Sequence, residues 1–316
     1  MPPCPKCFKT VAHFHSLRDV SISHAWVTVG IFDGVHLGHR ALLTRLVEGA
    51  RANGCSSVVL TLHPHPAVVL GGQEDFAYLS PPEEKAALLT ALGVDVVITQ
   101  LFDRDFASQT AEEFMRLLVQ TLGLRHLIIG YDTALGRGRE GDARRLTELG
   151  QALGYTVETI SAVQHGAKII SSSAIREQIR AGAVAEAAAA LGRWYTVSGP
   201  VVHGDGRGRH IHLPTANILY PQEKLIPPAG IYATWAWVGE KRYAAATNIG
   251  INPTFTPQRQ NIGIEAHLLD FSGDLYGQEV RLEFVQRLRG EQKFASAEAL
   301  LAQIQQDIAR VRELLT

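Results

Sequence analysis

The sequence lacks the features that would mark it as a secreted or membrane protein. Its 316 residues include three cysteines, too few and odd in number for a disulfide framework. No apolar run approaches the ~18 residues of a membrane span, and no apolar stretch follows the basic N-terminal residues as in a secretory signal. We therefore expect a cytoplasmic protein without a membrane partner.

An excess of charge of one sign is also missing. The chain has 30 Lys and Arg residues against 31 Asp and Glu residues, a net charge of −1. This balance argues against nucleic acid as a partner, although it leaves room for a local phosphate site. Hydrophobic residues make up 46% of the chain, which excludes a disordered protein. The length favours two domains.

The first part of the chain alternates apolar runs with helical patterns, which is typical of βαβ units and a mainly parallel sheet. Thr110 and Glu113 have the spacing of a capping box at a helix start. Ligands of such sheets bind outside the carboxyl ends of the strands. The expected strands are 26–32, 57–62, 94–99, 127–129 and 155–160, and the expected helices are 40–53, 83–92, 110–122 and 142–153.

A different pattern follows a short Ala-rich helix, 183–191. Short strands recur with Gly, Pro and Asn between them, which favours a small barrel or sandwich. Ser296 is expected to cap a long helix that reaches Leu315. We divide the chain into an N-terminal extension (1–14), an α/β domain (15–188) and a β-rich domain (189–316). The expected strands of the last are 195–202, 231–238, 242–249, 262–269 and 280–285.

The run GIFDGVHLGH joins the first expected strand to the first helix. His36 and His39 are three residues apart, so they share a face in a helical first turn. The free N–H groups and the dipole at that helix start favour anions. The run therefore predicts a triphosphate site without the lysine of a Walker loop, which the sequence lacks. The alternative is two ordinary histidines near a surface turn.

A site of this kind suits transfer of a nucleotidyl group. A phosphate of the acceptor attacks the α-phosphorus of ATP, and pyrophosphate leaves. The acceptor phosphate is already an anionic nucleophile, so no general base is required. Catalysis then depends on positioning and on stabilisation of charge in the transition state.

Two later segments fit the same pocket. Ser171, Ser172 and Ser173 place three hydroxyls at a helix start, with Arg176 three residues on, a set that suits phosphates. The alternative is an ordinary serine cap beside an exposed arginine. The run His-Pro-His-Pro at 63–66 ends the second strand, and its prolines either fix a loop near the ligand or only terminate the strand.

These motifs, in this order over roughly residues 15–190, resemble the N-terminal module of the bacterial bifunctional riboflavin kinase/FMN adenylyltransferases. The resemblance implies a Rossmann-like HxGH nucleotidyltransferase domain in which His36 and His39 are catalytic. The flavin-binding residues that it implies here are His63, His65 and Asp132. The ATP-binding residues that it implies are Gly30, Phe32, Asp33, Gly34, Gly38, Ser171, Ser172, Ser173 and Arg176.

One stretch departs from the family. The usual Asp/Asn-Phe-x-Phe-Gly run is here Asp-Thr-Ala-Leu-Gly at 132–136, so both aromatic positions are replaced. The departure concerns the packing around the nucleotide or the isoalloxazine, and therefore the efficiency of adenylyl transfer.

A second group of motifs lies in the β-rich part. The loop from Val202 to Arg209 has glycine at every second position, which suits phosphate binding or a plain hairpin. Thr215 and Asn217 offer a hydroxyl and an amide oxygen to a hard cation such as Mg²⁺, or form an ordinary turn. Glu265 shares a strand face with Gly263 and His267. It is either solvated or the base for phosphoryl transfer to an alcohol.

From about residue 195 to the end, these motifs together resemble the riboflavin kinase module of the same family, a small antiparallel six-stranded barrel with a C-terminal helix. The resemblance implies that Glu265 is the general base and that Thr215 and Asn217 bind Mg²⁺ and ATP. His212 stands where the family usually has glycine. Further implied ATP residues are Gly204, Gly206, Gly208 and Arg209, and implied flavin residues are Asn252, Thr254, Arg289, Glu291 and Phe294.

The sequence thus predicts an enzyme of flavin biosynthesis that phosphorylates riboflavin to FMN and adenylylates FMN to FAD. ATP is the co-substrate, Mg²⁺ the cofactor, and the partners are the small-molecule substrates riboflavin, FMN and ATP. Two alternatives remain: a riboflavin kinase with a weak adenylyltransferase module, and a flavin-binding regulator without catalysis. The sequence leaves the oligomeric state open.

A Cys-x-x-Cys pair at Cys4 and Cys7 stands apart from both sets of motifs. It has the spacing of half a zinc site, with His13 or His15 as further ligands. Structural zinc needs four ligands, and no second Cys-x-x-Cys occurs. We therefore expect a terminal extension here.

Overall fold

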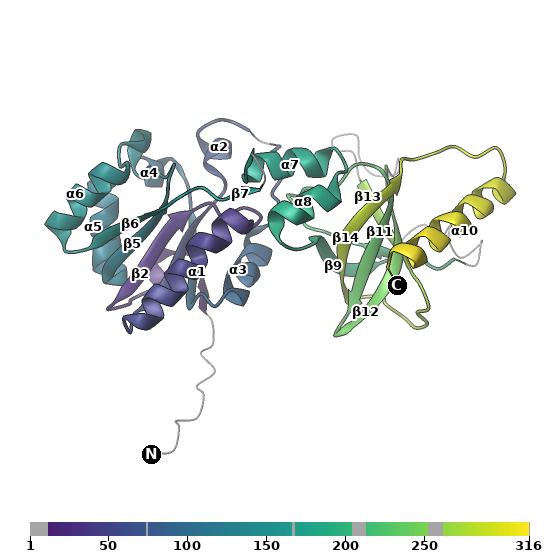
Figure 1. The fold of residues 1–316 in the computed structure, drawn as a ribbon, viewed down its shortest axis with the longest axis horizontal. Helices are drawn as coiled ribbons and strands as arrows, with labels where there is room; N and C mark the ends of the chain where they lie inside the picture. Colours follow the sequence, from purple (N-terminus) through teal and green to yellow (C-terminus); the bar gives the residue numbers. More distant parts are fainter. Residues whose placement is uncertain (1–11, 74, 166–167, 204–212, 252–261, 316) are drawn as a thin grey trace, which may run out of the picture. The chain divides into compact units, whose positions relative to one another are not determined.

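The computed structural model describes residues 12–73, 75–165, 168–203, 213–251 and 262–315 (Figure 1). The contacts within the chain divide it into two compact units, Met1–Ser171 and Ser172–Thr316. From the sequence, we place this boundary at 188. The difference arises because helices α7 (Ser172–Arg180) and α8 (Val184–Leu191) pack on each other, and α8 packs on strands of the second unit. The assignment of α7 and α8 to one domain or the other stays a prediction.

The first unit is built on a parallel sheet of six strands in the order β1-β4-β3-β2-β5-β6. A small antiparallel pair, β7 and β8, follows it. The strands are β1 (Ala12–Phe14), β2 (Ala25–Gly30), β3 (Ser56–His63), β4 (Val96–Leu101), β5 (Leu124–Gly130), β6 (Thr156–Ile160), β7 (Gln164–His165) and β8 (Lys168–Ile169). The helices are α1 (Leu37–Ala52), α2 (Pro66–Val69), α3 (Pro82–Ala91), α4 (Arg104–Ala107), α5 (Ala111–Leu122) and α6 (Ala143–Leu153).

Helices cover both faces of this sheet (Figure 1). Leu43 and Leu46 of α1 pack in one buried cluster with the α3 helix, and Met115 of α5 and Leu146 of α6 pack in another. After β2 the chain continues to β3, which lies on one side of β2 in the sheet, while β5 lies on the other side of β2. Such a switch point opens a crevice at the carboxyl ends of the strands, where ligands bind. The predicted α/β Rossmann-like architecture is confirmed.

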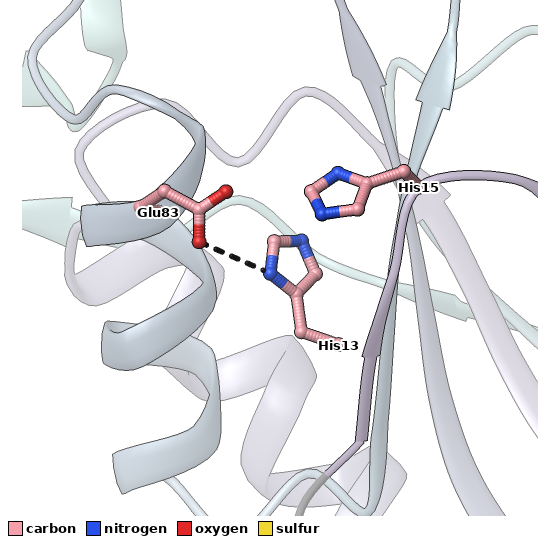
Figure 2. Close-up of side chains that lie close together, drawn as sticks. All are labelled: His13, His15 and Glu83. Carbon is pink, nitrogen blue, oxygen red and sulfur yellow. Dashed lines mark ion pairs between the residues drawn. The ribbon is translucent and has the colours of Figure 1, made fainter.

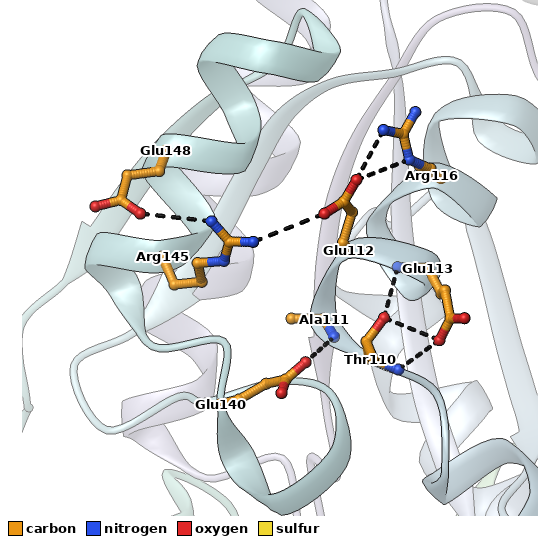
Figure 3. Close-up of polar contacts among 8 residues, drawn as sticks. All are labelled: Thr110, Ala111, Glu112, Glu113, Arg116, Glu140, Arg145 and Glu148. Carbon is orange, nitrogen blue, oxygen red and sulfur yellow. Dashed lines mark hydrogen bonds and ion pairs between the residues drawn. The ribbon is translucent and has the colours of Figure 1, made fainter.

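The start of α5 shows how local sequence fixes this fold. The predicted capping box is present: Glu113 N–H donates to the Thr110 hydroxyl, and the Glu113 carboxylate accepts from Thr110 N–H at 2.8 Å. Ala111 N–H donates to Glu140, which lies in the loop after β5 (Figure 3). This second hydrogen bond holds that loop against the helix start.

The last residues of the predicted N-terminal extension form a strand. Residues 12–14 form β1, an edge strand in which His13 pairs in register with Val97 of β4. A three-residue strand is too short to give a periodic signal. The pairing supplies the backbone hydrogen bonds that such a segment cannot make alone.

The second unit contains a closed antiparallel barrel in the order β10-β13-β12-β11-β14-β9. Buried and half-buried residues alternate along β9, as the pleat requires. The fully buried Tyr195, Tyr232 and Phe284 fill the interior. The strands are β9 (Tyr195–Val202), β10 (Ala216–Ile218), β11 (Gly230–Val238), β12 (Lys241–Ile251), β13 (Ile262–Leu268) and β14 (Glu279–Arg289).

A long C-terminal helix, α10 (Ala297–Leu314), packs against the barrel. Ser296 caps it, as predicted, by accepting from Ala299 N–H. Val311 and Leu315 contact the buried Ala233 and Leu269. The predicted barrel with a C-terminal helix is confirmed. Among the helices of the described residues, none has both the length and the apolar character of a membrane span.

Candidate active sites

The loop between β2 and α1 turns through an unusual backbone. Phe32, Gly34 and Val35 have φ angles of 50°, 79° and 40°. Glycine adopts such angles freely, whereas Phe32 and Val35 each cost about 1–3 kcal/mol there. Conformations of this kind persist only where the surroundings enforce them, and they gather at functional sites.

The surroundings do enforce this turn. The buried carboxylate of Asp33 accepts hydrogen bonds from Leu79 N–H at 3.1 Å and from Ser80 N–H at 2.9 Å. The Ser80 hydroxyl accepts from Gly34 N–H at 2.8 Å. Asp33 was predicted to contact ATP. The structure shows its carboxylate holding the loop, and ATP contact stays a prediction.

The two histidines meet at the start of α1, as their spacing predicts. Their rings stack at a centroid distance of 3.6 Å. His36 caps the helix, because its Nδ1 accepts from His39 N–H at 3.3 Å. A Cβ on Gly38 would lie 3.0 Å from the His36 ring. Glycine at this position therefore lets the imidazole fold back over the helix N-terminus.

His39 is held in the neutral form. Burial of its ring, and secondarily the nearby His36 and Lys85, place the pKa of His39 well below its ordinary 6.5. The Phe32 ring lies edge-on to it at 5.1 Å. A neutral imidazole keeps one N–H, which can donate a hydrogen bond to a phosphate oxygen without the ring carrying a charge.

The depressed pKa predicts how stability depends on pH. The unfolded chain protonates His39 below pH 6.5, while the folded chain does so only at lower pH. The stability that neutral His39 contributes to the folded chain is complete above pH 6.5. It falls as the pH drops toward the folded pKa, by up to about 1.4 kcal/mol per pH unit. Urea unfolding at several pH values should therefore show a shallower acid loss for His39→Asn than for the wild type. An unchanged slope would refute this origin.

Lys85 also supports the loop after β2, although no pattern in the sequence indicates this role. It is fully buried on α3, and its Nζ donates to the Ile31 carbonyl at 3.0 Å. Thr61 donates to the same carbonyl at 2.9 Å. The Lys85 charge also contributes to lowering the pKa of His63 and His39. Sequence reasoning missed this residue, since a lysine in the first turns of an amphipathic helix usually faces water.

Two other predicted segments follow β3 and β5, the strands on either side of β2, at the same sheet edge. His63 ends β3, and burial lowers its pKa. His65 caps α2 through its Nδ1, which accepts from Ala67 N–H at 3.0 Å. Exposed Asp132 follows β5, and its carbonyl accepts from Arg139 at 2.8 Å. The segment before Ser171 also reaches the site, since the Ile170 carbonyl would lie 3.9 Å from a Cβ on Gly38.

A second candidate site lies in the barrel, around Glu265. In register, Glu265 of β13 stands opposite Asn217 of β10 on one side and Asn248 of β12 on the other. The predicted alternation of faces along β13 is confirmed, because Ile264, Ala266 and Leu268 are buried while Glu265 is half-buried. Next to it, His267 Nδ1 lies 2.8 Å from the Pro214 carbonyl.

Two cavities lie beside the paired strands β10 and β13, and Thr215 lines both. The first, of about 740 Å³, has an apolar wall that includes Ile231, Ala246 and Phe294, together with Glu265. The second, of about 570 Å³, is lined by Asn217 and Tyr276 among others. The first has the mixed lining and size typical of a small-molecule site.

The segment after β14 is fixed to α10 at the rim of the first cavity. Arg289 makes a bidentate pair with Asp307, the shorter bond being 2.7 Å. Its guanidinium also lies 5.7 Å from the Phe294 ring. Glu291 lines the same cavity. Arg289, Glu291 and Phe294 are thus brought together, as the sequence predicts.

Comparison with known proteins identifies the family to which each part of the chain is similar. The FAD synthetase family model matches residues 19–174, and the riboflavin kinase family model matches residues 191–315. The chain is 38% identical over 307 residues to the bifunctional riboflavin kinase/FMN adenylyltransferase of Escherichia coli K12, covering 96% of this chain and 97% of that protein. The protein of the same name from Bacillus subtilis is 34% identical and covers 94% of each chain. The chain belongs to this family.

The two-unit fold is shared with a solved structure of a differently named protein. The crystal structure of a macrolide-efflux protein from Streptococcus pneumoniae matches with a TM-score of 0.87 and 29% identity, covering 96% of this chain and 98% of that one. The likeness extends through both units. The efflux name belongs to the Streptococcus protein, and for this chain the match supports the fold.

Several implied flavokinase and FAD synthetase residues are left untested by the structure. Ser172, Ser173 and Arg176 belong to the second contact unit, so their contact with ATP stays a prediction. Others lie outside the described residues: Gly204, Gly206, Gly208, Arg209, His212, Asn252 and Thr254.

The Arg289–Asp307 pair gives a stability prediction for the riboflavin kinase module. Both side chains are largely buried, with 16% and 9% exposure. Asp307→Ala would leave a buried guanidinium without its carboxylate, so the free energy of unfolding should fall by about 3 kcal/mol. Denaturant unfolding followed by fluorescence measures it. Arg312→Ala, which breaks an exposed pair with Asp270, is the control and should cost much less. Equal losses would contradict the assignment.

Proposed function

We propose that the two units catalyse successive steps. The barrel unit phosphorylates the terminal ribityl hydroxyl of riboflavin with ATP, giving FMN and ADP. The α/β unit then transfers the adenylyl group of ATP to the FMN phosphate, giving FAD and pyrophosphate. Both family models and the curated relatives support this pair of activities. As the sequence predicts, we expect both steps to run in the cytoplasm.

The observation that carries the kinase assignment is the position of Thr215 between two cavities, one of which also contains Glu265. The flavin ring would occupy the more apolar cavity, and the nucleotide the one lined by Asn217 and Tyr276. Its phosphates would then approach the ribityl chain near Thr215. Glu265 takes the proton of the attacking hydroxyl as the oxygen bonds to the γ-phosphorus and the bond to ADP breaks.

The donor set beside Glu265 fits the magnesium ion that a kinase of this family would use. The Thr215 hydroxyl and the Asn217 amide oxygen are hard, neutral oxygen donors, and Mg²⁺ binds few protein ligands while keeping phosphate and water. Both residues line the second cavity, where the nucleotide is proposed. Bound there, the ion would neutralise phosphate charge.

The adenylyltransferase assignment rests on the stacked histidines at the N-terminus of α1. The N–H groups and the dipole of the helix N-terminus attract the ATP phosphates, and the imidazoles stabilise the charge that develops on the phosphates. The FMN phosphate attacks the α-phosphorus, and the bond to pyrophosphate breaks. The nucleophile is already an anion, so this step requires no proton to be removed from it.

The loop after β5 favours one alternative, an adenylyltransferase of reduced efficiency. Thr133 replaces an aromatic residue of the family, and its hydroxyl accepts from Gly130 N–H at 3.0 Å. Leu135 replaces another; it packs beside the buried cluster and pairs with Gly141. Both side chains therefore serve the loop itself and offer no ring for stacking.

Incubation with FMN, Mg²⁺, ATP and pyrophosphatase, followed by chromatography of the flavins, decides between a fully active adenylyltransferase and one of reduced efficiency. We expect FAD to accumulate, and Thr133→Phe with Leu135→Phe to change its rate without affecting FMN formation from riboflavin. No FAD from the wild type, with FMN formation intact, would leave a monofunctional riboflavin kinase.

A further inference from the structure

Two histidines and a glutamate gather at the edge of the sheet, and none of them is among the residues predicted for either site. His13 lies on β1 and His15 directly follows it, so the two share a face of the strand. Glu83 lies in the first turn of α3. Figure 2 shows the three side chains directed toward one another. One ligand atom from each lies within 4.8 Å of the others.

The hydrogen bonding of His13 prepares it as a ligand. Its Nε2 lies 2.9 Å from the hydroxyl of Thr99, and its Nδ1 lies 3.4 Å from Glu83 Oε2. When Nε2–H donates to Thr99, Nδ1 directs a lone pair toward the carboxylate. In that tautomer a metal ion between Nδ1 and the Glu83 carboxylate would bind to both.

The separation of His13 and Glu83 fits a zinc ion. Ligand atoms about 2.0–2.1 Å from a tetrahedral Zn²⁺ stand ~3.4 Å apart, the separation of His13 Nδ1 and Glu83 here. The second imidazole lies close by, with the rings of His13 and His15 4.7 Å apart. Two imidazoles and a carboxylate are a set that Zn²⁺ accepts with water as the fourth ligand.

We propose that His13, His15 and Glu83 form a zinc-class metal site. The ion would join the edge strand β1 to α3, the helix whose Lys85 holds the loop of the stacked histidines. The site therefore strengthens the scaffold and takes no part in the chemistry. It is independent of the two activities, since it uses none of their residues.

The test measures Zn²⁺ affinity of the full chain by competition with a chromophoric chelator. A Cys4→Ser/Cys7→Ser background removes both N-terminal thiolates, so that binding reports the histidines and the glutamate. We expect about one ion per chain in this background, and an affinity at least tenfold lower after His15→Ala or Glu83→Gln. Both residues are exposed, so the variants should fold.

Matched controls are His24→Ala and Glu84→Gln, which remove the same side-chain types outside the cluster. They should leave the affinity unchanged. Zn²⁺ should also raise the unfolding temperature of the parent chain and not that of the Glu83→Gln variant. The proposal is overturned by equal affinity in the cluster and control variants, or by loss of all binding in the Cys4→Ser/Cys7→Ser background.

Discussion

Glu265→Gln should lower the turnover of riboflavin phosphorylation by at least about 100-fold while adenylylation of supplied FMN persists. Glutamine keeps the shape of the side chain but cannot take the proton of the ribityl hydroxyl, and general base catalysis contributes ~10²–10⁴-fold. Glu265 lies on β13, in the barrel unit, whereas the stacked histidines lie on α1 in the other unit. Separate assays with riboflavin and with FMN, each with Mg²⁺ and ATP, measure the two effects.

The matched control is Glu279→Gln, on an exposed position at the start of β14 in the same barrel. It should leave both rates unchanged. The affinity of the Glu265→Gln variant for riboflavin, measured by quenching of flavin fluorescence, should stay near that of the wild type, because the cavity is preserved. A loss of both activities together would argue against separate sites, and full kinase activity would remove Glu265 from the mechanism.

The double variant His36→Ala/His39→Ala should abolish FAD formation and spare FMN formation. The stacked rings are the charge-stabilising groups at the proposed phosphate site, and removal of even one such group commonly costs ~10²–10³-fold in turnover. The flavin products from riboflavin, separated by chromatography, should therefore stop at FMN.

His36 also caps α1, so a structural loss has to be separated from a chemical one. His36→Asn keeps a side chain that can accept from the helix N–H groups and retains the cap, which is worth about 1 kcal/mol. Compared with the single variant His36→Ala, it should restore the stability without restoring adenylyl transfer. Restored FAD formation would show that His36 acts only as a cap.

Much of the architecture could be predicted because strong periodic patterns determine it. The capping box at Thr110, the alternation along β13 and the cap at Ser296 all form as expected. Short strands such as β1 and β10 were missed, since three residues carry no periodic signal and long-range pairing decides them. The boundary near Ser171 depends on which strands α8 packs against, and the sequence does not encode that contact locally.

The site residues divide in the same way. Motif spacing placed the histidines on one face, and strand alternation placed Glu265 on the face of β13 opposite its buried residues. The register of Glu265 with Asn217 came only from the structure. Motif spacing could not reveal that Asp33 and Lys85 hold the strained turn, because both roles depend on segments far apart in the chain. Nor could it show that Glu83 stands beside His13.

The most direct test of two successive activities is a time course of purified full-length protein with riboflavin, Mg²⁺ and ATP, with the flavins separated at intervals. We expect riboflavin to fall, FMN to rise first, and FAD to follow with release of pyrophosphate. Riboflavin that stays unchanged while the protein is folded would contradict the proposed function.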